Sequence, residues 1–141
     1  MNRVNPKLRN FARHLIIHEA KILEPAGSHP PAAFPVVEKL RPHLAILMGR
    51  IGFRSLLARA LALAGAEVPW LRNLHLKPDG MLPRVDELAA PVVPADRFEG
   101  QVVLVAQLLG LLVAFIGENL TFRLVAEALP KLPAGKKSFK L

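Results

Sequence analysis

The sequence predicts an all-α protein, a bundle of four to five helices with a long, central, apolar C-terminal helix and a short hairpin or turn near residues 74–82. Two long segments carry apolar residues at spacings of three and four, which is the helical period. Residues 52–67 are rich in alanine and leucine, the strongest helix formers. The tripeptide Pro78-Asp79-Gly80 between apolar residues is a turn signal, because proline presets φ and glycine accepts a positive φ.

Length and composition indicate one domain. The chain has 141 residues, of which 52% are hydrophobic and 21% charged, and it contains no cysteine. A chain of this size can bury roughly two thirds of the surface that its unfolded form exposes, so the core needs no disulfide bond to be stable. The absence of cysteine excludes disulfides, thiolate metal sites and a cysteine nucleophile. We predict a single helical domain over residues 1–130 and a basic disordered tail over 131–141.

The net charge of +8 is concentrated at the two ends of the sequence. Residues 1–24 have a balance of +3, residues 131–141 a balance of +4, and the body between them a balance of only +1. This pattern is typical of a basic arm and tail on an ordinary domain rather than of a basic binding face. The candidate residues for contact with a polyanion are Lys131, Lys136, Lys137 and Lys140.

Three helices are predicted in the first half of the chain. Asn5 and Pro6 have the pattern of an N-cap and first helical residue, which predicts a helix over about 6–24. A second helix begins near Pro35, and Pro42 inside it is expected to kink it or to start a new helix. The glycines of residues 48–53 predict a break, after which a third helix runs over about 52–67.

A connector and one long helix are predicted in the second half. Trp70 and Leu71 are expected to be buried anchors, and prolines mark residues 83–97 as a connector. No proline occurs from residue 98 to 129, which predicts a helix about 46 Å long that Gly117 bends or splits. Asp96 is the expected N-cap of this helix, with Glu99 three residues later in a capping arrangement.

Residues 102–116 raise the question of a membrane span. Fifteen residues, apolar except for Gln107 and Gly110, form a helix of about 22 Å, which is short of the roughly 30 Å hydrocarbon core. Charged residues flank the segment on both sides. These features favour a buried core helix, while the mean hydropathy of +0.31 leaves membrane association as an alternative.

The long helix is apolar on every face, which indicates burial within the domain or against a partner. One stripe carries the small residues Gly110, Ala114, Gly117 and Thr121. Small residues let another helix approach closely, so this stripe is either packed against the alanine-rich third helix or is a seam for self-association. A stripe of large residues should form core, with members Leu104, Leu108, Leu111, Phe115, Phe122, Val125 and Leu129.

Few side chains have the spacing of a catalytic or metal site. His14 and His18 share a helix face, but a zinc site needs at least one more protein ligand, from His29, His43 or His75. Glu118 interrupts the large-residue stripe and is expected to pair with Arg50, Arg54 or Arg59, or to face solvent. No nucleophile elbow, phosphate loop, dinucleotide fingerprint or zincin motif is present, so we predict no enzyme activity and no cofactor.

Three segments carry a family resemblance: GFRSLLARALALAGAEVPWLR, LKPDG and EGQVVLVAQLLGLLVAFIGENLTFRLV. Over roughly residues 34–130 the chain resembles an uncharacterised family of small helical bacterial proteins. The resemblance implies a bacterial, cytoplasmic protein that is an accessory component of a multi-gene system, and it assigns no functional residues.

The leading functional hypothesis is a non-catalytic interaction module that presents an apolar helix surface to a protein partner or to another copy of itself. One alternative is a small membrane-associated or membrane-active protein whose basic ends meet anionic lipid. Another is an accessory protein that binds nucleic acid non-specifically through its basic termini.

Overall fold

The computed structural model describes residues 5–22, 34–84, 88 and 92–130. Its elements are α1 (Pro6–Ile22), α2 (Pro35–Glu67), the short 3-10 helix η1 (Pro69–Asn73), α3 (Pro94–Ile116) and α4 (Glu118–Ala128). Apart from a bridge residue at Arg84, these described segments contain no strand. The prediction of an all-α bundle is confirmed.

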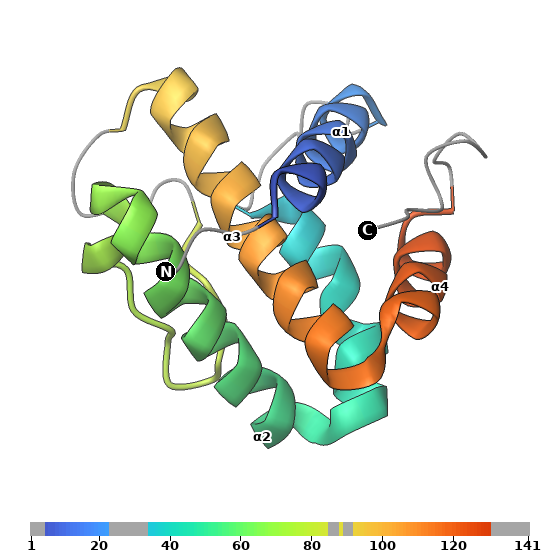
Figure 1. Cartoon of the computed structure of the whole chain (residues 1–141). Coiled ribbons are helices and arrows are strands. Elements are labelled where there is room, and N and C mark those ends of the chain that lie inside the picture. Colours follow the sequence, from blue (N-terminus) through green and yellow to red (C-terminus); the bar gives the residue numbers. More distant parts are fainter. Residues whose placement is uncertain (1–4, 23–33, 85–87, 89–91, 131–141) are drawn as a thin grey trace.

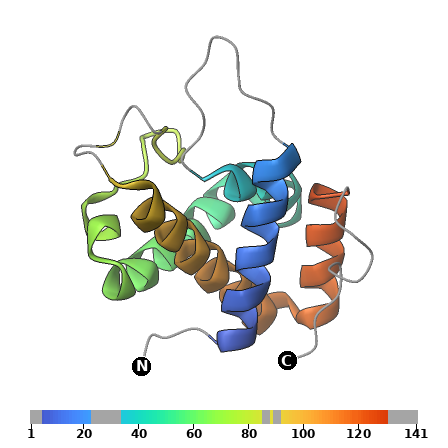
Figure 2. The same ribbon diagram turned by 90° about the horizontal axis from the view of Figure 1, so that it is seen from above.

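Helix α3 lies at the centre of the bundle (Figure 1). The two halves of α2 form an elbow around it, and α1 packs across it from another side (Figures 1 and 2). After α3 the chain reverses, and α4 packs against α3 and α2. The middle of α3 is therefore covered on all sides within one chain, since every residue from 102 to 109 is buried.

The elbow of α2 is at Gly49, inside the break expected over residues 48–53. Gly49 has φ 80° and ψ 162°, which are non-helical angles, while the segments before and after it are helical. Pro42 does not start a new helix, because the helical backbone continues through it, and its ring is exposed. Proline forfeits one backbone hydrogen bond here, and water can solvate the carbonyl left without a donor.

Gly117 splits the long apolar segment into α3 and α4. It has φ 89° and ψ 163°, almost the same angles as Gly49. Of the two expectations for Gly117, the split is the one that occurs, so the segment is not a single helix of about 46 Å. The N-cap prediction for Asp96 is wrong: the helix begins earlier, with Pro94 as its first residue and Val93 as its N-cap, and Asp96 lies in the first turn. Proline suits the first position because its fixed φ is already helical.

The Pro78-Asp79-Gly80 segment forms the predicted turn. The Gly80 amide donates to the Lys77 carbonyl at 2.7 Å and the Lys77 amide donates to the Met81 carbonyl at 2.9 Å. Gly80 has φ 84°, which glycine adopts without strain. The turn sits in the elbow of α2, because Arg41 before Gly49 donates to the Gly80 carbonyl and Arg54 after it donates to the Pro78 carbonyl.

The first turns of α3 are fixed by Trp70, which packs partly buried against the core. Its indole Nε1 donates to the Asp96 carbonyl at 3.0 Å, and its ring stacks on Phe34 with centroids 6.3 Å apart. Gly100 lies directly against the ring, and a Cβ there would meet Trp70 Cζ2 at 2.4 Å. Elsewhere in the bundle, Phe11 and Phe122 make an edge-to-face pair at 5.1 Å that joins α1 to α4.

Candidate functional site

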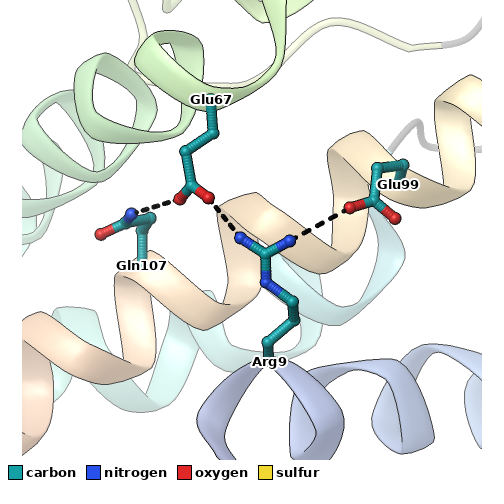
Figure 3. A network of polar contacts seen from close by, with 4 residues as sticks. All are labelled: Arg9, Glu67, Glu99 and Gln107. Atoms are coloured by element: carbon teal, nitrogen blue, oxygen red, sulfur yellow. Dashed lines mark hydrogen bonds and ion pairs between the residues drawn. The ribbon is translucent and has the colours of Figure 1, made fainter. Parts of the chain in front are cut away.

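A partly buried polar network joins α1, α2 and α3 (Figure 3). Arg9 binds Oε1 of Glu67 through Nη2, and its Nη1 lies 3.4 Å from Oε1 of Glu99. Gln107 donates to Oε2 of Glu67 at 2.8 Å. Both oxygens of the Glu67 carboxylate therefore have protein partners. The network therefore links three helices through one carboxylate.

The described histidines, His14, His18, His43 and His75, are not gathered into a three-residue group that could hold a metal ion. His14 and His18 are half-buried on α1. Within the segments that the structure describes, no group of three histidine or acidic side chains is close enough to hold a metal ion. His29 lies outside the described residues, as does the tail with Lys131, Lys136, Lys137 and Lys140.

The stripe of small residues does not form one face. Thr121 is fully buried, and its hydroxyl donates to the Gly117 carbonyl at 2.7 Å. Gly110 is half-buried, whereas Ala114 and Gly117 are exposed. The break at Gly117 changes the direction of the chain, so the helical spacing that relates these four residues in the sequence does not continue through it. The seam remains a prediction, but the four residues cannot act as one continuous surface.

Large apolar side chains are exposed at both helix breaks. Ile46 and Ile51, which flank Gly49, are 87% and 83% exposed, and Leu47 is 43% exposed. Phe115, two residues before Gly117, is 74% exposed. The expectation that Phe115 belongs to a core stripe is therefore wrong, because α4 folds away from the last turn of α3 and does not cover it. Both breaks lie at the same end of the bundle, the lower end in Figure 1.

A pocket of 620 Å³ opens inside the elbow of α2, beside the first of these breaks. Pro42, Ala45 and Ile51 give it apolar walls, and the Pro78-Asp79-Gly80 turn closes one side. Each nitrogen of the Arg41 guanidinium has a partner: Nε and Nη2 donate to the two oxygens of Glu38 and Nη1 donates to the Gly80 carbonyl. The group also lies over the Phe53 ring.

Arg50 and Arg54, which also line this pocket, have guanidinium nitrogens with no hydrogen-bond partner among the described residues. Arg54 uses Nη1 on the Pro78 carbonyl at 3.0 Å, which leaves its Nε and Nη2 groups available. Arg50 is exposed and makes no hydrogen bond or ion pair with any residue of the described segments. The pocket therefore combines an apolar interior with a rim that favours an anionic group.

A second depression, of 740 Å³, lies between α2 and residues 71–76. Arg72 in it donates to the Gly65 carbonyl at 2.9 Å, and His75 on its edge is exposed. The carboxylates of the described chain do not line it. It offers no pair of groups for acid–base chemistry.

Glu118 has no ion pair within the described part of the chain. It is half-buried in the first turn of α4, where the N-terminal end of the helix favours a negative charge. Neither Arg50, Arg54 nor Arg59 pairs with it among the described residues. Of the two expectations for Glu118, pairing with one of these arginines is not met.

The sequence analysis did not predict the exposed apolar side chains at the two helix breaks. A glycine beside large apolar residues occurs in both segments and was a signal for them.

Helix α3 also has the length and composition of a membrane span, with a mean hydropathy of 2.0 over its most apolar window. Core helices of soluble proteins have the same property, and 56% of this window is buried inside the bundle.

The protein is an all-α helical bundle with large apolar side chains exposed at the breaks at Gly49 and Gly117. Comparison with known protein families, with curated proteins and with solved structures found no match to the chain. The family resemblance and the bacterial, cytoplasmic setting that it implies stay predictions.

Proposed function

We propose that the protein is a non-catalytic interaction module that binds a protein partner or another copy of itself through the end at the two helix breaks. The observation that carries this proposal is the exposure of Ile46, Ile51 and Phe115 at that end. Exposing three large apolar side chains costs solvation free energy of roughly 1.5–3 kcal/mol each relative to burial. Exposed apolar clusters on soluble proteins commonly mark interaction sites.

The covered interior of α3 changes where a partner is expected to bind. The middle of this helix needs no partner, because α1, α2 and α4 already bury residues 102–109. Its last turn is exposed at Ala114 and Phe115, at the end of the bundle where α2 also breaks (Figure 1). The surface proposed for docking, here called the apolar end, consists of Ile46, Leu47, Ile51 and Phe115.

A triple variant tests this function. Ile46→Gln, Ile51→Gln and Phe115→Gln remove the apolar surface while introducing a residue that is compatible with a helix. We expect the triple variant to keep its far-UV circular dichroism spectrum and to lose both self-association in light scattering and the partners captured by the wild-type protein in its native host.

Val93→Gln is the matched control, because Val93 is 60% exposed at the other end of α3. It should behave like the wild-type protein in both measurements. A wild-type protein that stays monomeric at high concentration and captures nothing would overturn the proposal, as would a triple variant that keeps the wild-type partners.

Peripheral membrane binding is the second candidate function. The apolar end borders Arg50 and Arg54, an arrangement that suits the surface of an anionic bilayer. Flotation with vesicles of anionic lipid tests it. Binding that the triple variant loses would assign the apolar end to lipid, and recovery in the unbound fraction at low salt would exclude this candidate.

A further inference from the structure

We propose that the occupant of the apolar end is a second copy of this chain, with Phe115 and Glu118 of each copy docked on the α2 pocket of the other. The inference rests on the proposed function and deepens it by naming the partner. In this arrangement Phe115 enters the pocket beside Ile51, and the Glu118 carboxylate binds Arg50 and Arg54 at its rim.

The two breaks are alike in backbone and opposite in charge. Gly49 has φ 80° and ψ 162°, and Gly117 has φ 89° and ψ 163°. The residue after Gly49 is Arg50, whereas the residue after Gly117 is Glu118. Large apolar side chains are exposed beside both. One break thus carries an exposed apolar surface with a positive charge, and the other carries one with a negative charge.

The charges at both breaks lack ion-pair partners within the described part of the chain. Glu118 has no ion pair there, Arg50 has none either, and Arg54 keeps two donor groups free. A carboxylate between two guanidinium groups accepts charge-assisted hydrogen bonds from both, and the described part of a single copy does not provide these bonds to Glu118 or Arg50. The pocket volume of 620 Å³ is in the range that accepts a group as large as a phenyl ring.

Both breaks lie at one end of the bundle (Figure 1), and the proposed pair is arranged around a two-fold axis so that the contact forms twice. In such a pair the pocket of each copy receives the Phe115 and Glu118 of the other, and the assembly closes at two subunits. Two equivalent contacts also double the effect of any substitution on the stability of the pair.

Charge reversal tests the contact on the full-length protein. We expect Arg50→Glu alone and Glu118→Arg alone each to raise the dissociation constant of the dimer by about 100-fold or more, because each places like charges at both contacts. The variant that combines both reversals restores an opposite-charge pair between positions 50 and 118, while Arg54 stays beside the new positive charge. Its dissociation constant should therefore lie well below those of the single variants and above that of the wild-type protein. Sedimentation equilibrium measures all four dissociation constants.

Mixing the two single variants gives the sharpest result. In a two-fold pair of unlike subunits, one contact brings together the two reversed charges, one from each variant, and these are opposite in sign. The other contact joins the unchanged Arg50 and Glu118, so the mixture should form a dimer at a concentration at which each variant alone is mostly monomeric. A folding defect cannot produce this rescue.

Arg59→Glu is the matched control for the charge variants. Arg59 lies on the same helix as Arg50, has no ion pair among the described residues and does not line the pocket. Its reversal changes the net charge of the chain by the same amount as Arg50→Glu does. We expect the Arg59→Glu variant to dimerise with the wild-type dissociation constant.

Three outcomes would overturn the inference: a monomeric wild-type protein, open-ended assemblies larger than a dimer, or charge variants that associate as the wild-type protein does. The proposed function is judged separately. If the charge variants have no effect while the triple glutamine variant still loses a captured partner, the apolar end binds another protein and only the self-docking arrangement fails.

Discussion

At the scale of single residues, Gly49 and Gly117 determine the shape of the molecule. Their φ values of 80° and 89°, with ψ values of 162° and 163°, lie in a region that only glycine occupies without strain. An added Cβ at either position would meet no atom within 4 Å. The requirement for glycine is therefore conformational and does not come from crowding.

We expect Gly49→Ala and Gly117→Ala each to lower the free energy of unfolding by about 1–3 kcal/mol, the cost of a side chain in this backbone region. Urea denaturation at low protein concentration measures it. Gly52→Ala is the matched control. Gly52 is helical, and its new Cβ would lie at an ordinary contact distance of 3.4 Å from Met48 Cβ. Alanine should therefore raise the free energy of unfolding by about 1 kcal/mol. Destabilisation of all three variants alike would contradict the conformational explanation.

The sequence identified these glycines as helix breaks but could not give their angles. A glycine in a helical pattern either stays in the helix, as Gly52 does, or leaves it, as Gly49 does, and the two cases have the same local sequence signal. Which one occurs depends on where the next helix finds apolar contacts, and that is a property of the packed molecule.

At the scale of the elements, the Arg9 network fixes how α1, α2 and α3 meet. The Glu67 side chain is 12% exposed, so its carboxylate has little access to water if a partner is removed. Pro94, at the start of α3, and Trp70, against which Gly100 packs, position the α3 end of this network. Contacts between helices distant in sequence, such as this one, do not leave a periodic signal that sequence analysis can find.

A double-mutant cycle should show the coupling between Arg9 and Glu67. Arg9→Met leaves a largely buried carboxylate with one partner and should cost about 1–3 kcal/mol in the free energy of unfolding. Arg9→Met with Glu67→Met should cost less than the sum of the two single changes, with a coupling of about 0.5–3 kcal/mol. Urea denaturation of the four proteins measures it.

Glu99→Gln is the control for this cycle. Its contact with Arg9 is longer, at 3.4 Å, and its side chain is 43% exposed, so the loss should stay below about 1 kcal/mol. A coupling energy of zero between Arg9 and Glu67 would mean that their ion pair does not contribute to the free energy of unfolding.

At the scale of the whole molecule, the bundle buries its most apolar segment and leaves an apolar surface at one end. The all-α class, the turn at residues 77–81 and the break near Gly49 followed from local patterns, since each depends on residues close in sequence. The exposure of Phe115 did not, because the stripe that includes it looks like core until α4 turns away at Gly117. The sequence therefore pointed to the small-residue stripe as the interaction site, whereas the structure draws our proposal to the two breaks.

Association through this end should appear in the thermal stability of the whole protein. Binding of the folded state raises the melting temperature with concentration, because unfolded chains do not associate in the same way. We expect the wild-type melting temperature to rise over a concentration series and that of the triple glutamine variant to stay constant. Equal behaviour of the two proteins in circular dichroism melts would contradict association through the apolar end.

The contact between Trp70 and Gly100 has a practical consequence. The chain contains one tryptophan and no tyrosine, so its ultraviolet emission is dominated by a single indole. That indole is bonded to Asp96 in the first turn of α3, about 28 Å along the helix from Phe115. Emission should change when the bundle unfolds and stay unchanged when two bundles meet, so one sample can report the two equilibria separately.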